Sequence, residues 1–96
     1  MSQDSSKLTY LLSITPTDPN SEYHGRKRDH AQRVHEMILE NINNSKNSES
    51  EKQKRRSQIN RASENYQSSL GTDNETGSFN KFVSVGSSIA EAMTNE

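Results

Sequence analysis

The apolar residues of this chain fall into four short islands separated by polar linkers, and this pattern limits what the chain can fold into. In the longest island, four residues recur at positions i, i+3, i+7 and i+11: Ala31, Val34, Ile38 and Ile42. At 100° per residue, such positions form one stripe along a helix, which Met37 widens. Gly25 is a poor helix residue, so we expect this central helix to span residues 26–43.

A second helix is expected over residues 49–70, where the same spacing occurs again at Ile59, Ala62, Tyr66 and Leu70. Ser48 and Glu51 fit the S-x-x-E capping box at its start, and Gly71 is well placed as its C-terminal stop. The stripe is thin, so this helix would hardly be stable alone. It could pack against the central helix as an antiparallel hairpin.

The C-terminal island also follows helical spacing, at Phe79, Phe82, Val83, Gly86, Ile89, Ala90 and Met93. Ser78 is a natural N-cap for a helix over residues 79–93. The segment KFVSV would also suit a short strand, but the stripe persists through the whole island and favours a helix.

The N-terminal island, LTYLLSI, places three leucines on one side of a single helical turn: Leu8, Leu11 and Leu12. Three interpretations remain open, of which we favour packing of this turn on the central helix. The L-x-x-L-L pattern also matches helices that dock into a groove of a partner, and a short edge strand is the third interpretation. The TPTDPN stretch that follows stops any helix.

Only 26% of the 96 residues are hydrophobic, whereas ordinary domains have roughly 45–50% apolar residues with Gly included. Each ordered residue loses roughly 1–2 kcal/mol of backbone entropy, which so few apolar side chains offset poorly. The chain has no cysteine, so no disulfide can compensate. We therefore expect a mainly disordered chain with transient α-helices or, if it is ordered, a loose all-α assembly with helices near 26–43, 49–70 and 79–93.

This pattern divides the chain into four segments. Residues 1–25 form an N-terminal tail with the LTYLLSI island and the TPTDP turn, and residues 26–70 form a basic, hairpin-like helical region. Residues 71–78 are a linker, and residues 79–96 are an amphipathic C-terminal segment. The amino terminus lacks the basic start of a secretory signal, and no apolar run approaches the roughly 18 residues of a membrane span. We therefore expect an intracellular protein, nuclear or cytoplasmic, without a membrane partner.

Positive charge gathers in the middle of a chain whose formal net charge is −1. Positions 26 to 61 hold ten basic and five acidic residues, a difference of +5 (10 − 5). The basic patch consists of Arg26, Lys27, Arg28, Lys52, Lys54, Arg55, Arg56 and Arg61. Such residues can form solvated helix surfaces, contact nucleic-acid phosphates, act as an import signal or meet an acidic protein surface. No aromatic residue lies between positions 26 and 61, and Tyr66 is the first that follows, so little base stacking is expected.

No arrangement of side chains in the sequence indicates catalysis or metal binding. His30 and His35 are five residues apart, about 140° around a helix, whereas ligands on one helix face need a spacing of three or four. We expect these imidazoles, and that of His24, to be solvated and to titrate near pH 6.5. No serine or threonine lies in a nucleophile motif. The sequence therefore predicts no enzyme, no metal, no cofactor and no small-molecule substrate.

The predicted function is a non-enzymatic protein-interaction module, a small phosphorylatable regulator or accessory subunit of a larger intracellular complex. It would dock amphipathic helices on a partner through Val34, Met37, Ile38, Ile42, Phe79, Phe82, Val83 and Ile89. The N-terminal docking alternative would use Leu8, Leu11 and Leu12. Thr15 precedes a proline, and Ser57 and Ser63 follow arginines closely, so all three are candidate phosphorylation sites. The alternative function is a nucleic-acid-associated accessory factor that uses the basic middle region.

Overall fold

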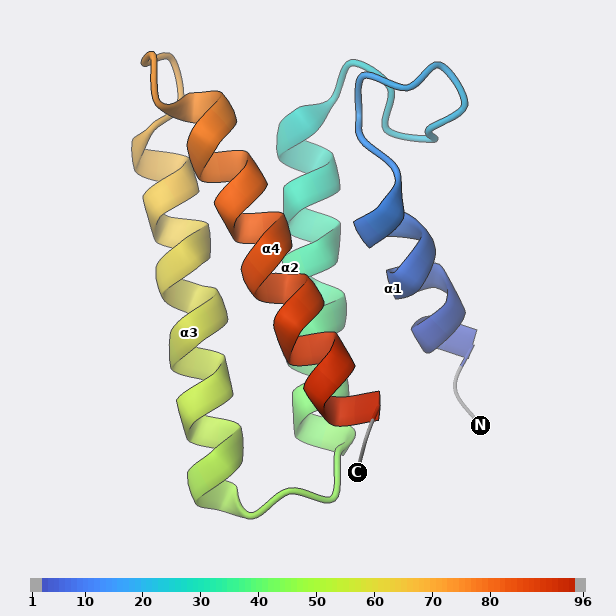
Figure 1. The fold of residues 1–96 in the computed structure, drawn as a ribbon, viewed down its shortest axis with the longest axis vertical. Coiled ribbons are helices and arrows are strands. Elements are labelled where there is room, and N and C mark those ends of the chain that lie inside the picture. The colour runs from blue at the N-terminus through green and yellow to red at the C-terminus, as the bar shows by residue number, and fades with distance from the viewer. Residues whose placement is uncertain (1–2, 95–96) are drawn as a thin grey trace.

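Four helices form a bundle in the computed structural model, which describes residues 3–94 and the side chains of residues 8–93 (Figure 1). The helices are α1 (Gln3–Ser13), α2 (Lys27–Asn44), α3 (Glu49–Ser68) and α4 (Glu75–Thr94). The last three run alternately up and down, so that each is antiparallel to the next. Helix α1 packs against α2 and α4, on the side of the bundle away from α3.

The structure confirms an all-α fold and shows that the prediction of a mainly disordered chain was wrong. One core joins the four helices: Leu8, Leu11, Ala31, Val34, Met37, Ile38, Ile42, Ile59, Ala62, Tyr66, Phe79, Phe82 and Ile89. A bundle helix needs only one apolar stripe, because its other faces meet water. A low hydrophobic share can therefore build a core when the apolar residues fall on the stripes, as they do here.

Helix α1 packs on α2, which confirms the favoured interpretation of the LTYLLSI island as a turn that packs on the central helix. The side chains of Leu8 and Leu11 are buried, and Leu12 is partly buried against the core. The helix spans Gln3–Ser13, so it is longer than the single helical turn that the leucine spacing predicted. The Tyr10 hydroxyl donates to the Asn20 carbonyl at 3.2 Å and ties α1 to the loop that follows it.

The helix boundaries follow the predicted turn chemistry, except at the start of α4. Gly25 lies just before α2 and Gly71 just after α3, and both have positive φ, at 77° and 81°. The Ser48 hydroxyl caps α3 by accepting from the Glu51 N–H at 3.3 Å. Ser78 was expected to cap the last helix but lies inside it. Its N–H already donates to the Asn74 carbonyl at 2.9 Å, so helical bonding begins one turn earlier.

His30 contradicts the prediction of a solvated imidazole, because its side chain is fully buried. Its Nε2 atom is hydrogen-bonded to the Leu11 carbonyl at 2.8 Å, a contact that joins α2 to α1. The rings of Tyr23 and Phe79 pack edge-on against it, each with a centroid 5.8 Å away. Burial lowers the His30 pKa below its ordinary 6.5, although the bond to Leu11 opposes this shift.

Gly86 allows α4 to approach α2 closely. A Cβ atom added at this position would lie 2.7 Å from Ile38 Cδ1 and 3.4 Å from Leu12 Cδ2. The first distance is below any normal contact between carbon atoms, so a side chain here would push on the buried Ile38. Gly77, also in α4, differs because a Cβ atom added there would meet nothing within 4 Å.

These two glycines give the first prediction. Gly86→Leu should lower the free energy of unfolding by about 1–3 kcal/mol, because the larger side chain overpacks the contact with α2. Gly77→Ala should raise it by about 0.5 kcal/mol, since alanine restricts the unfolded chain and meets no neighbour. Urea unfolding followed by circular dichroism measures both changes. A neutral Gly86→Leu variant would contradict the close approach of α4 to α2.

The second prediction concerns the pH dependence of stability. The folded state lowers the His30 pKa, so below about pH 6.5 the unfolded chain binds more protons than the folded chain. The free energy of unfolding should therefore fall as the pH drops from 7.5 to 5.5. The His30→Gln variant has no titratable side chain at position 30, so its free energy of unfolding should depend less on pH. Equal slopes in the parent and His30→Gln would show that His30 does not carry the effect.

Candidate functional site

The apolar residues for which we predicted partner docking lie in the core of the bundle. Those of α2 are fully buried: Val34, Met37, Ile38 and Ile42. Those of α4 are also buried, apart from the partly buried Val83: Phe79, Phe82 and Ile89. Leu8 and Leu11 of the N-terminal island are buried with them. While the bundle is closed, these side chains contact one another and a partner cannot reach them.

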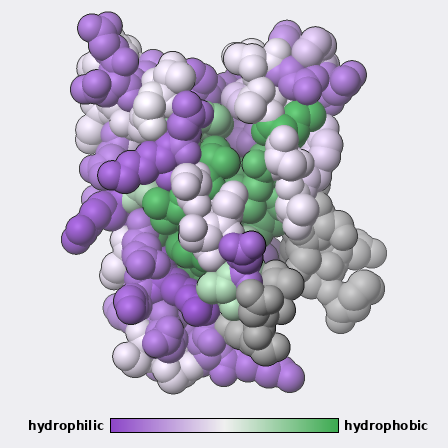
Figure 2. All heavy atoms as spheres, in the orientation of Figure 1, coloured by the Kyte–Doolittle hydropathy of each residue, from purple (hydrophilic) through white to green (hydrophobic). Residues whose placement is uncertain are grey.

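A groove runs between α3 and α4 on the outside of the bundle. It consists of two adjoining hollows, of about 680 and 290 Å³, which share Gln58, Arg61 and Val85. Its α3 wall is formed by Lys54, Ser57, Gln58, Arg61, Ala62 and Asn65. Its α4 wall is formed by Ser78, Lys81, Phe82, Ser84, Val85, Ser88 and Ile89. Figure 2 shows apolar surface between more polar side chains on this side of the molecule.

The α3–α4 groove combines an apolar floor with positively charged walls. Val85, which is partly buried, presents apolar surface at the base, and the buried Ile89 lies beside it. Lys54, Arg61 and Lys81 are exposed along the two walls, and none of the lining residues is acidic. The α3 wall spans about 17 Å at 1.5 Å per residue, the length of a three-turn helix.

The predicted basic patch is spread over the bundle, and its two clusters of neighbouring residues lie at opposite ends of α2. Lys52 Nζ and Arg56 Nε both donate to Asn43, at 3.1 and 3.0 Å, and so lie beside the turn between α2 and α3. Arg56 also pairs with Glu49 at 3.1 Å. Residues 26–28 lie at the other end of α2, which is about 27 Å long. The patch therefore does not form one continuous positive surface.

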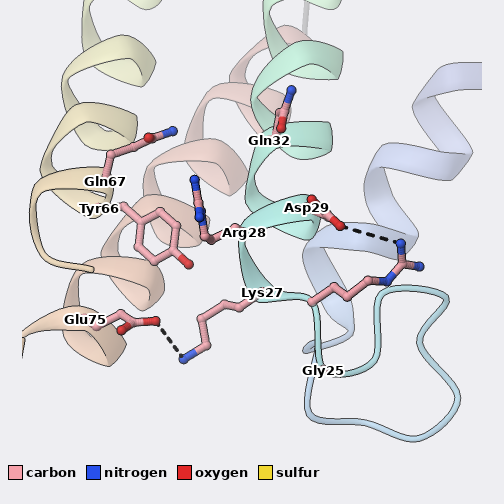
Figure 3. A pocket seen from close by; sticks show the side chains of 9 residues that line it. Gly25, Lys27, Arg28, Asp29, Gln32, Tyr66, Gln67 and Glu75 are labelled. Carbon is pink, nitrogen blue, oxygen red and sulfur yellow. Dashed lines mark ion pairs between the residues drawn. The ribbon is translucent and has the colours of Figure 1, made fainter. Parts of the chain in front are cut away.

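A separate pocket of about 440 Å³ lies at that end of the bundle, where α2 begins, α3 ends and α4 begins (Figure 3). We call it the end pocket, and its lining residues are Gly25, Arg26, Lys27, Arg28, Asp29, Gln32, Tyr66, Gln67 and Glu75. Two ion pairs cross its rim, between Arg26 and Asp29 at 3.6 Å and between Lys27 and Glu75 at 3.9 Å.

Tyr66 contributes a hydroxyl to the end pocket, a role that the sequence did not indicate. Its place on the α3 stripe correctly predicted a core ring, which packs edge-on against Phe79 at 5.5 Å. Its hydroxyl is buried yet has no hydrogen-bond partner in the described part of the chain. Burial and the nearby Glu75 carboxylate raise the Tyr66 pKa above its ordinary value, although Arg28 opposes the shift. Only the tertiary structure places this hydroxyl beside the start of α2.

The three candidate phosphorylation sites have different surroundings. Ser57 is exposed and lines the α3–α4 groove, whereas Ser63 is partly buried and does not line it. Thr15 is exposed in the loop between α1 and α2, where its hydroxyl shares a 2.8 Å hydrogen bond with that of Thr17. Of the three, only Ser57 lies where a phosphate would change a groove.

The histidines lie apart from one another and in different surroundings. His24 is exposed, and its Nδ1 atom is 3.2 Å from the Asp18 carbonyl. His35 is partly buried, with its Nε2 atom 2.7 Å from Asn60 Oδ1 and its ring edge-on to Phe82. Within the described residues, no group of three or more histidine and carboxylate side chains is placed to hold a metal ion.

Among the helices of residues 3–94, none combines the length and apolar character needed to cross a bilayer. Comparison with known proteins gives no relative. No family model matches the chain, and no curated protein or solved structure matches it.

Proposed function

We propose that this protein is a non-enzymatic interaction module that binds an acidic, amphipathic helix of a protein partner in the α3–α4 groove. The observation that supports this proposal is the pairing of an apolar floor with Lys54, Arg61 and Lys81 on walls that hold no acidic residue. Such a module would act as a small regulator or accessory subunit of a larger intracellular complex.

The two parts of the groove make different contributions to such a complex. Apolar side chains of the partner would cover Val85 and the aliphatic parts of the lining side chains, and this burial would supply most of the affinity. Carboxylates of the partner would lie near the three cations, where exposed ion pairs contribute about 0–1 kcal/mol each. These charges would mainly speed association and exclude basic partners.

A nucleic-acid role uses the same cations but has less support. A phosphate-backbone footprint needs basic residues along one surface, and the structure separates residues 26–28 from Lys52 and Arg56 by the length of α2. Phe82 is the aromatic residue among those that line the groove, and it is buried. The groove therefore offers no exposed ring for stacking a base, and an acidic protein helix fits it better.

The third prediction tests the occupant of the groove with a displayed peptide library selected on the immobilised protein. Selected peptides should carry apolar residues at i, i+3 or i+4 and i+7, with Asp or Glu between them. Their binding should perturb the amide resonances of residues 54–65 and 78–89. Lys54→Glu combined with Arg61→Glu should weaken binding by about tenfold or more, because two attractions become repulsions.

A matched control reverses two exposed cations outside the groove, Arg28→Glu and Lys46→Glu. This control changes the net charge equally and should bind the selected peptides nearly as well as the parent. Equal losses in both variants, or selected peptides without acidic residues, would contradict the proposal. Binding of a DNA or RNA duplex with a steep salt dependence, in place of peptides, would favour the nucleic-acid role.

The fourth prediction concerns Ser57, which lines the groove. It lies on the same wall as Lys54 and Arg61 and is close to both in the sequence. Phosphate at this position would add about 1.5–2 negative charges and compete with the carboxylates of a partner. Ser57→Glu should therefore weaken binding of the selected peptides severalfold. Ser63→Glu, which adds the same charge outside the groove, should affect affinity much less in the same assay. A stronger loss in Ser63→Glu would argue against control through the groove.

A further inference from the structure

The end pocket differs from the α3–α4 groove in its chemistry. Nearly all of its lining side chains are charged or amides, and it is formed where the ends of three helices meet (Figure 3). Its volume of about 440 Å³ falls in the range of roughly 300–1,000 Å³ that small-molecule sites occupy. The pocket is therefore large enough for a small polar molecule.

The start of α2 supplies backbone donors to this pocket. Arg26, the N-cap residue, makes no side-chain capping bond, and the first helical N–H to reach a backbone carbonyl is that of His30, which donates to Arg26. The N–H groups of the first turn carry the positive end of the helix dipole, which favours an anion. A helix start alone is a common feature and would not define a site.

The Tyr66 hydroxyl provides an independent indication of a ligand. The residue is only 2% exposed, and its hydroxyl has no hydrogen-bond partner among the described residues, although such groups nearly always find one when buried. In Figure 3 the hydroxyl points from α3 toward the beginning of α2, where Lys27 and Arg28 lie. A tyrosine hydroxyl is protonated at neutral pH, and the raised pKa of Tyr66 favours this form further, so the hydroxyl is available as a donor.

The charges around the pocket leave one cation without a carboxylate partner in the described part of the chain. Arg26 and Lys27 are each within 4 Å of a carboxylate, that of Asp29 or Glu75, so these charges largely compensate one another. Arg28 makes no ion pair with any of the described residues. The net charge of the five ionised side chains is +1 (3 − 2), to which the helix start adds.

We propose that the end pocket binds a small phosphomonoester, such as a sugar phosphate, through its phosphate group. The phosphate accepts hydrogen bonds from the Tyr66 hydroxyl and the first-turn N–H groups of α2, and it pairs with Arg28. A phosphate group alone does not fill the pocket, so the carbon skeleton of the ester occupies the rest. The amides of Gln32 and Gln67 line that space and can bond to its hydroxyl groups. This site is independent of the α3–α4 groove.

The experiment titrates the full chain with ribose 5-phosphate, inorganic phosphate and a phosphoserine peptide, using amide resonances and the melting temperature as readouts. Ribose 5-phosphate should shift the amides of residues 27–29 and raise the melting temperature of the parent. Tyr66→Phe keeps the buried ring and removes only the hydroxyl. It should melt at the same or a higher temperature without ligand, yet bind ribose 5-phosphate about tenfold more weakly.

Arg28→Gln should weaken ribose 5-phosphate binding by about tenfold or more, because it removes the charge that pairs with the phosphate. Lys46→Gln removes one exposed charge from the loop between α2 and α3 and should bind as the parent does. The proposal is overturned if the amides of residues 27–29 do not respond, if Tyr66→Phe binds as well as the parent, or if Lys46→Gln is weakened as much as Arg28→Gln. Inorganic phosphate binding as tightly as the ester, or binding of the phosphopeptide alone, would overturn the assignment to a small phosphomonoester.

Discussion

The structure depends on the apolar stripe of α2, which packs against all three other helices, as α4 also does. Val34, Ile38 and Ile42 are fully buried along this stripe, and Gly86 allows α4 to settle directly on Ile38. His30 continues the same face to the end of the helix and bonds to the backbone of α1. Within residues 3–94, α1 and α3 do not pack on each other, so α2 and α4 together join them into one bundle.

This central role of α2 explains why its stripe is not a docking surface in the closed bundle. A chain with few apolar residues uses nearly all of them in the core that the four helices share. Residues that remain available to partners therefore lie on the outer faces of the helices and at the ends of the bundle. These positions are mostly polar or charged. At two places, the α3–α4 groove and the end pocket, charged side chains line a hollow that is large enough for a ligand.

Local sequence patterns predicted the helices well because helical spacing, caps and glycine stops act over a few residues. Ser48, Gly71 and the stripes of residues 26–43 and 49–70 all have their expected positions to within about two residues. Composition failed as a guide to order because it counts apolar residues without regard to their position. The burial of His30 was visible in principle, since it lies four residues before Val34 on the same face. Its partner, the Leu11 carbonyl, belongs to another helix and has no sequence signal.

The candidate sites were less predictable than the helices. The α3–α4 groove brings Lys54 and Arg61 beside Val85 and Ile89, residues that are far apart along the chain. The end pocket is formed because the start of α2 lies beside the end of α3. Only this arrangement places the buried hydroxyl of Tyr66 at the pocket. The sequence did show that residues 26–28 and 52–56 are basic, but not that the bundle holds the two clusters at opposite ends.

The thin core also determines how freely this sequence can change. Among residues 8–93, whose side chains the structure describes, thirteen buried apolar side chains form the core that joins the four helices. Most other positions face water, where substitutions usually change stability by less than about 0.5 kcal/mol. The information that specifies the fold is thus confined to a small, regularly spaced subset of positions. The surface that would recognise a partner can therefore vary almost independently of the scaffold that carries it.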